Sequence, residues 1–200
     1  MGKINEKKHE KEQKLLDTAF DLFISKGINE TTIQDIVDNA GVAKGTFYLY
    51  FKDRYEIIEA IISIKTVKLF DDAISASRKM NYKNFTEQFL YIIDYILNEL
   101  TQNQQLLKFI CKNLSMGINE THFKQNAKED FKSNVSKAIF EMFVQRASAE
   151  GLKLQDPRVT LFMIIELVGS TCYNSILFNE PLPIEAYKPY LYDAIEKLLK

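Results

Sequence analysis

Three basic side chains lie close together in residues 41–54: Lys44, Lys52 and Arg54. One acid, Asp53, opposes them, so this stretch carries a local charge of +2. Cations spaced along a short segment can bind phosphate groups, the contacts that supply most of a protein's affinity for nucleic acid. An ordinary solvated helix surface has a similar composition, so the charge alone leaves both interpretations open.

Hydroxyl groups and a small residue lie among these cations. Thr46 and Tyr48 can donate hydrogen bonds to phosphate oxygens, and Gly45 lets the backbone approach a surface closely. Leu49 falls on the same outer side when Phe47 points inward. The segment is therefore a candidate DNA-binding surface.

Two short predicted helices, residues 32–40 and 43–51, position these side chains. A helix-turn-helix needs a turn residue that tolerates a left-handed backbone, and Gly41 lies between the two helices. The residues expected to face inward are Ile36, Ala40, Val42, Phe47 and Tyr50. Plain helical proteins also place two short helices around a glycine, so the spacing by itself is only moderately specific.

Helices are the only elements that the rest of the sequence predicts. Glycine and proline are scarce (7 and 4 residues), and apolar residues recur at helical spacing almost throughout. The expected helices are one ending at Gly27 and then residues 53–77, 86–100, 104–114, 121–150, 157–178 and a last one reaching residue 200. A change near residues 75–85 from short to long helices predicts a first domain at 1–52, a connecting helix at about 53–78 and a second domain at 79–200.

Composition excludes several classes of protein. With 200 residues, 46% hydrophobic and 26% charged, the chain is not a disordered one. The longest apolar run, residues 161–169, contains Glu166 and is too short to span a membrane. The charged N-terminus lacks the apolar core of a signal peptide, and two cysteines cannot form a disulfide framework, so a cytoplasmic protein is expected. The first sixty residues hold nine basic and eleven acidic side chains, so local pattern, and not net charge, must support DNA binding.

No catalytic or metal site is predicted. His9 and His122 are far apart and lack a partner at ligand spacing. Cys111 and Cys172 look like small buried hydrophobic residues. The sequence also contains no phosphate-binding glycine loop and no serine-nucleophile elbow, so neither an enzyme nor a cofactor is expected.

Residues 12–62 resemble the DNA-binding region of the TetR family of bacterial transcriptional regulators. The matching motifs are FISKG at 23–27, TT at 31–32, AGV at 40–42 and YLYFK at 48–52. Val37 stands where alanine is usual, and Arg54 stands where lysine is usual. The resemblance covers about a quarter of the chain and is highly specific there.

The resemblance implies an all-helical homodimer with an N-terminal helix-turn-helix DNA-binding domain and a C-terminal effector-binding and dimerisation domain. By position, the implied DNA-binding residues are Thr31, Thr32, Lys44, Gly45, Thr46, Tyr48, Leu49, Lys52 and Arg54. Thr32 and Tyr48 would contact phosphates, and Lys52 and Arg54 would clamp a phosphate. Lys7, Lys8 and Lys11 are weaker candidates for further contacts. The expected function is a ligand-responsive, sequence-specific regulator, and a repressor is favoured.

The C-terminal half supplies candidates for the effector site and the dimer interface. The aromatic residues of this half predict a pocket for a hydrophobic or aromatic effector, which could also carry a positive charge. The candidate residues are Phe89, Tyr91, Tyr95, Phe109, Phe131, Phe140 and Glu166. The resemblance places dimerisation in the last two helices, with candidates Leu161, Ile165, Val168, Cys172, Ile176, Leu191, Ile195 and Leu198. An ordinary intramolecular core would also explain both sets of residues, and that alternative stays open.

Two other classes of function also stay open. One is a helical module of the same fold that no longer binds DNA and acts through a protein partner, which the acidic balance of the first sixty residues supports. The other is a small helical enzyme, although no acid–base or nucleophile pair is clustered in the sequence. The sequence does not identify the operator, the effector or the regulated genes.

Overall fold

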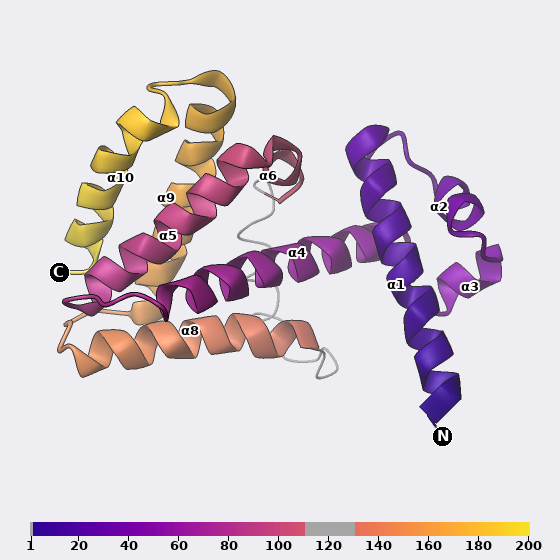
Figure 1. Cartoon of the computed structure of the whole chain (residues 1–200), viewed down its shortest axis with the longest axis horizontal. Helices are drawn as coiled ribbons and strands as arrows, with labels where there is room; N and C mark the ends of the chain where they lie inside the picture. The colour runs from indigo at the N-terminus through magenta and orange to yellow at the C-terminus, as the bar shows by residue number, and fades with distance from the viewer. Residues whose placement is uncertain (1, 111–130) are drawn as a thin grey trace. The chain divides into compact units, whose positions relative to one another are not determined.

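The computed structural model describes the backbone of residues 2–110 and 131–200 and the side chains of 8–110 and 139–200. Every regular element in these residues is a helix, as Figure 1 shows, so the predicted all-α fold is confirmed. The helices are α1 (Gly2–Ser25), α2 (Ile33–Ala40), α3 (Lys44–Tyr48), α4 (Arg54–Ser77), α5 (Phe85–Gln102), α6 (Gln104–Ile110), α8 (Phe131–Ala149), α9 (Pro157–Phe178) and α10 (Ile184–Leu198). Two predicted helices, 104–114 and 121–150, are described only in part. Their residues 111–114 and 121–130, which include Cys111 and His122, lie outside the described residues.

The chain divides into two compact units, Met1–Ile62 and Ser63–Lys200. The division falls inside α4, the helix that the sequence predicted as a connection between two domains. One continuous helix therefore contributes residues to both units.

The first unit is built from α1, α2, α3 and the start of α4. Helix α2 packs on α1, and α3 packs on α2. Gly41 ends α2 in the left-handed conformation (φ 62°) that the helix-turn-helix interpretation requires. Of the residues expected to face inward, Ile36, Ala40 and Phe47 are buried, whereas Val42 and Tyr50 are only half-buried.

Helix α3 is shorter than the predicted residues 43–51. It ends at Tyr48, where the chain turns. After the turn, Phe51 is buried in the core and Asp53 caps the next helix. The Asp53 carboxylate accepts hydrogen bonds from the backbone N–H groups of Tyr55 and Glu56, at 2.8 and 3.0 Å. Capping of α4 therefore limits the length of α3.

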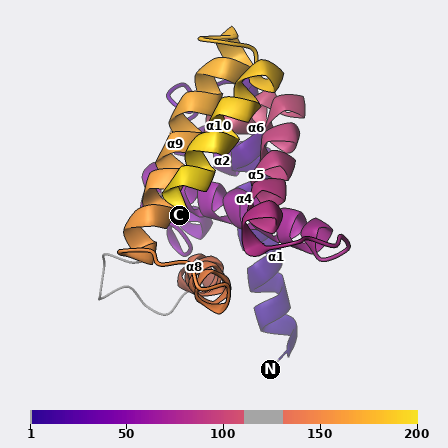
Figure 2. The ribbon, with the colours of Figure 1, turned by 90° about the vertical axis from the view of Figure 1, so that its left-hand side faces the viewer.

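The second unit is organised around α9, which packs against α6, α8 and α10; α9 and α10 run side by side in Figure 2. Asp156 caps α9 by accepting from the Arg158 N–H at 2.8 Å, and Pro157 occupies the first turn, as the sequence predicted. By length and composition, α9 is the one helix in the described parts of the chain that could cross a membrane. One face of α9 is nevertheless buried against its neighbours, as in a core helix.

A polar cluster joins α10 to α5. Lys188 is buried, and its Nζ lies 3.0 Å from Asp94 Oδ1 and 2.6 Å from Asn98 Oδ1, to which it donates. The Tyr192 hydroxyl donates to Asp94 at 2.5 Å. Burial by itself raises the pKa of Asp94, but the hydrogen bonds from Tyr192 and Lys188 outweigh it and hold that pKa below its ordinary value. The cluster fixes the register of α10 on α5.

Candidate nucleic-acid interface and effector pocket

Helix α3 exposes most of the residues predicted to contact DNA. Lys44, Gly45, Tyr48 and Leu49 are exposed, and Thr46 is half-buried. Tyr48 has 52% and Leu49 75% of its surface accessible. The structure thus brings the predicted α3 residues together on one surface.

Aromatic side chains hold α3 in place from below. Phe47 is fully buried, and its ring centroid lies 5.6 Å from those of both Tyr48 and Phe51. The Tyr50 hydroxyl donates to the carbonyl oxygen of Lys8 in α1 at 2.9 Å. A short helix has little stability of its own, so these contacts fix the exposed surface of α3.

The two threonines before α2 are occupied within the protein. Thr31 is completely buried and its hydroxyl donates to the Gly27 carbonyl at 2.7 Å, so it is not available to DNA. Thr32 caps α2: its hydroxyl donates to Asp35 Oδ2 at 2.7 Å and accepts from the Asp35 N–H. Hydrogen bonds from Lys26 and then Thr32 hold the pKa of Asp35 well below its usual range. The predicted phosphate contact of Thr32 would compete with this capping box.

Arg54 does not have the geometry of the predicted phosphate clamp. Its Nη1 donates to the carbonyl oxygens of Ile28, Asn29 and Thr31, at 3.0, 3.1 and 3.0 Å. The guanidinium therefore braces the loop between α1 and α2 through this one nitrogen. The arginine found where related sequences usually have lysine was the one signal of this difference.

The remaining predicted cations are exposed. Lys52, Lys8 and Lys11 have exposed side chains, and the side chain of Lys7 lies outside the described residues. The Lys52 backbone N–H donates to the Glu56 carboxylate, which fixes the backbone at the start of α4. The exposed Lys52 side chain is compatible with the predicted phosphate contact, which stays a prediction.

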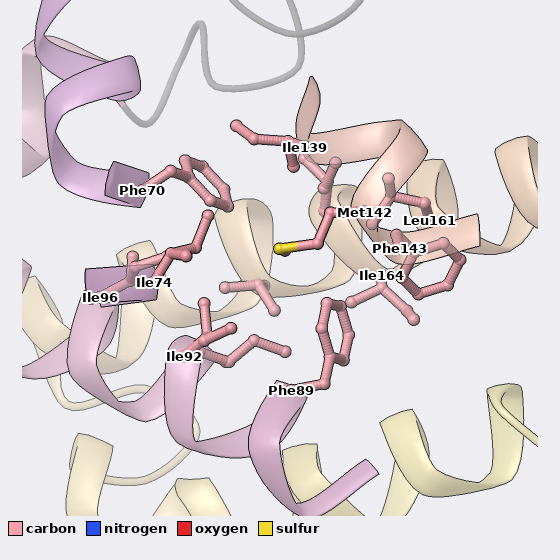
Figure 3. Close-up of a pocket in the computed structure, with 13 residues that line it drawn as sticks. Phe70, Ile74, Phe89, Ile92, Ile96, Ile139, Met142, Phe143, Leu161 and Ile164 are labelled. Atoms are coloured by element: carbon pink, nitrogen blue, oxygen red, sulfur yellow. The ribbon is translucent and has the colours of Figure 1, made fainter. Parts of the chain in front are cut away.

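A closed apolar pocket of about 40 Å³ lies in the second unit, between α4, α5, α8 and α9. Figure 3 shows that the lining atoms are carbon, with one methionine sulfur. The lining residues are Phe70, Ile74, Phe89, Ile92, Ile93, Ile96, Ile139, Met142, Phe143, Leu161, Ile164, Ile165 and Val168. An engineered apolar cavity that binds benzene measures about 150 Å³, so a ligand of that size or larger must move the lining side chains here.

Of the residues predicted to contact an effector, Phe89 lines this pocket. Tyr91, Tyr95, Phe109, Phe140 and Glu166 are not among its lining residues, and the side chain of Phe131 lies outside the described part. The turn of α5 explains why the tyrosines do not line this pocket, because Tyr91 and Tyr95 share a face different from that of Phe89 and the isoleucines. The isoleucines were not predicted to line a pocket, since aliphatic residues at helical spacing carry no signal that separates a pocket from a core.

No metal site is present among the described side chains: no three His, Cys, Asp or Glu residues are grouped to hold an ion. Cys172 is buried, and burial raises the pKa of its thiol to about 11. The thiol is therefore protonated at neutral pH.

Comparison with known proteins agrees with this arrangement. Residues 15–61 match the sequence model for bacterial regulatory proteins of the tetR family, a span that contains α2, α3 and the braced loop before them. This N-terminal part of the chain belongs to the TetR family. The matched residues contain the helix-turn-helix formed by α2 and α3.

Relatives match this chain over most of its length. The uncharacterized HTH-type transcriptional regulator YvdT of Bacillus subtilis is 24% identical over 94% of this chain and 95% of its own. Among solved structures, FadR from Bacillus halodurans aligns with a TM-score of 0.60 at 17% identity, covering 92% of this chain and 96% of its own. FadR from Bacillus subtilis, solved in complex with stearoyl-CoA, gives 0.60 at 18% identity, covering 94% and 97%. These matches support a DNA-binding regulator with a two-part helical fold.

The residues predicted for the dimer interface of this protein belong largely to its own core. Seven of the eight are buried within the single chain: Leu161, Ile165, Val168, Cys172, Ile176, Leu191 and Ile195; Leu198 is half-buried. Three of them also line the apolar pocket. The alternative of an intramolecular core is therefore correct for these side chains. The exposed apolar residues of α9 and α10 are instead Val159, Phe162, Met163, Phe178 and Tyr190.

Proposed function

We propose that this protein is a cytoplasmic, homodimeric repressor that binds a specific operator through α3 and is released by a small apolar effector. The observation that carries the proposal is the surface of α3. Its Lys44, Tyr48 and Leu49 point outward from a helix whose Phe47 is fully buried. A surface with cations, a hydroxyl and a small residue on a fixed helix is suited to the major groove.

Dimerisation would use the outer face of α9 together with α10. Val159, Phe162 and Met163 are 52%, 44% and 41% accessible, and Tyr190 on α10 is 67% accessible. An apolar face of this kind on two neighbouring helices favours a self-complementary contact across a two-fold axis. Two copies of α3 would then read half-sites about 34–36 Å apart on the DNA.

The effector we propose is a molecule with an aliphatic chain. The pocket contains no nitrogen or oxygen in its lining side chains, so a cationic effector would find no counter-charge there. Isoleucine, leucine and phenylalanine match a hydrocarbon chain, and a polar group on the ligand would have to remain outside the pocket. The FadR structure with stearoyl-CoA supports an acyl chain as the first ligand to test.

Helix α4 would transmit the effect of the ligand. Phe70 and Ile74 of α4 line the pocket, and Arg54 at the other end of the same helix braces the loop before α2. Because the pocket is so small, an acyl chain would displace α4 side chains on entry. The ligand shifts operator binding only to the extent that it prefers the displaced arrangement.

The proposal is tested by fluorescence-anisotropy titration of the full chain against its own upstream intergenic DNA, with scrambled DNA as competitor, at two salt concentrations. We expect sequence-selective binding that weakens steeply with salt. Tyr48→Ala should weaken binding to all sequences alike, and Lys44→Ala should also change sequence preference. Lys79→Ala, an exposed lysine of the second unit, serves as the matched control. A folded dimer without selective binding would favour the module that acts through a protein partner.

A further inference from the structure

Leu49 is the most accessible large apolar side chain reported for the described residues, at 75%. A single exposed leucine is ordinary on a protein surface. Leu49 differs because its neighbours on the exposed surface of α3 can all make polar contacts. Lys44 carries a charge, Tyr48 carries a hydroxyl group, and the backbone of Gly45 is not covered by a side chain. Leu49 is the apolar group of this surface.

The backbone holds Leu49 outward. It is the C-terminal cap of α3 in a right-handed helical conformation (φ −76°, ψ −20°), and its N–H donates to the Thr46 carbonyl at 3.2 Å. Phe47 and Phe51, two positions to either side in the sequence, are buried with their ring centroids 5.6 Å apart, whereas Leu49 keeps 75% of its surface accessible. The core at this point is therefore filled by the two phenylalanines, and the leucine side chain lies outside it.

An isobutyl group gains nothing from a phosphate, because it has no hydrogen to donate and no charge. In the major groove the apolar feature of a base pair is the C5-methyl group of thymine, which lies at the groove surface beside the hydrogen-bonding edges. Since the hydroxyl and ammonium groups around Leu49 can take the phosphates and polar edges, the methyl group is the complementary partner for the leucine.

We propose that Leu49 determines part of the operator sequence by packing against a thymine C5-methyl group, once in each half-site. The proposal rests on the proposed function, since it requires that α3 enter the major groove. It assigns to one side chain a specificity that does not depend on hydrogen bonds or salt.

The test removes only the methyl group. An operator is first obtained by selecting tight binders from random double-stranded DNA with the full-length protein. Each thymine of that operator is then replaced by deoxyuridine, symmetrically in both half-sites, and binding is measured by anisotropy for the wild type, Leu49→Ala and Leu49→Met. Leu182→Ala, a leucine that is 37% accessible in the second unit, is the matched control.

We expect one thymine position at which deoxyuridine weakens wild-type binding about fourfold per half-site, the effect of leaving one methyl group in water. Binding of Leu49→Ala should no longer be weakened by deoxyuridine at that position, whereas any effect of deoxyuridine at other positions should remain. Leu49→Met, which retains an apolar side chain, and Leu182→Ala should keep it. These variants change exposed residues, so folding is not at risk.

Two results would overturn the inference separately from the proposed function. If a selective operator is found but Leu49→Ala remains as sensitive to deoxyuridine as the wild type at every position, Leu49 does not read a methyl group. The same conclusion follows if the selected operator contains no thymine at which deoxyuridine weakens binding. If the wild type selects no sequence at all, the proposed function fails, and this inference fails with it.

Discussion

The guanidinium of Arg54 lies 3.0 Å from the carbonyl oxygen of Thr31, a residue 23 positions earlier in the chain. The same nitrogen also contacts the carbonyls of Ile28 and Asn29. This contact ties the first residue of α4 to the segment that leads into α2. The two cations at the start of α4, Lys52 and Arg54, therefore have different roles: one faces outward and the other supports the protein.

Exchanging each of these cations for methionine separates their roles. Arg54→Met removes a charged donor from three carbonyls, so we expect the free energy of unfolding to fall by about 2 kcal/mol, together with operator affinity. Lys52→Met should lower affinity on all DNA sequences and reduce the salt dependence, while stability changes by less than about 0.5 kcal/mol. Urea denaturation and anisotropy titration measure the two quantities. Equal stability of both variants would show that Arg54 does not brace the loop.

The polar cluster between α5 and α10 predicts a pH-dependent stability. Asp94→Asn removes one of the two carboxylates that pair with buried Lys188, the other being Glu185 at 2.8 Å, and we expect a loss of about 1 kcal/mol at pH 7. The folded-state pKa of Asp94 is below its ordinary value of 3.8, so its stabilising effect is complete above about pH 4 and disappears as the pH falls through the folded-state pKa. Denaturation curves of wild type and variant should therefore converge on acidification.

The exposed Asp71 provides the control for this experiment, because Asp71→Asn should change stability by less than about 0.5 kcal/mol. A difference between Asp94→Asn and wild type that persists unchanged into strong acid would contradict the role given to the carboxylate.

The outer face of α9 is expected to carry the dimer contact. Phe162→Glu places a charge where the proposed interface excludes water, so we expect a monomer in sedimentation velocity, with helix content unchanged by circular dichroism. Met80→Glu, at a position that is 55% accessible outside α9 and α10, should remain a dimer. If Phe162→Glu also sediments as the wild-type dimer, the contact lies elsewhere.

Filling the apolar pocket should weaken the response to acyl chains. Met142 lines the pocket and is half-buried, so a larger ring there can be accepted at a cost of about 1–3 kcal/mol. Wild-type protein should gain about 5 °C or more in Tm at a hundredfold excess of an acyl ligand over its Kd. Met142→Trp should lose most of that gain, first for the longest chains, while still binding operator DNA.

Met80→Trp introduces the same ring on the exposed surface and serves as the control. An acyl ligand that stabilises Met142→Trp as strongly as the wild type would show that it binds outside this pocket.

The sequence by itself determined most of the helices and the location of the candidate DNA-binding surface, because those features depend on local chemistry. Gly41 supplies the left-handed turn between α2 and α3, and Asp156 with Pro157 starts α9; each signal acts within a few residues. The alternation of Phe47 with outward-facing Tyr48 and Leu49 likewise follows from the helical period. These features could be predicted without knowing what the helices pack against.

The tertiary structure decided what each face meets. Helical spacing showed that Leu161, Ile165 and Val168 share one face of α9, but only the packing against α8 and its neighbours showed that this face lines a pocket inside the chain. Arg54 was predicted to bind phosphate, whereas carbonyls 23 to 26 positions away take up its hydrogen bonds. The helical spacing of apolar residues shows which side chains share a face of a helix. What that face contacts depends on residues distant in the sequence, so only the tertiary structure shows it.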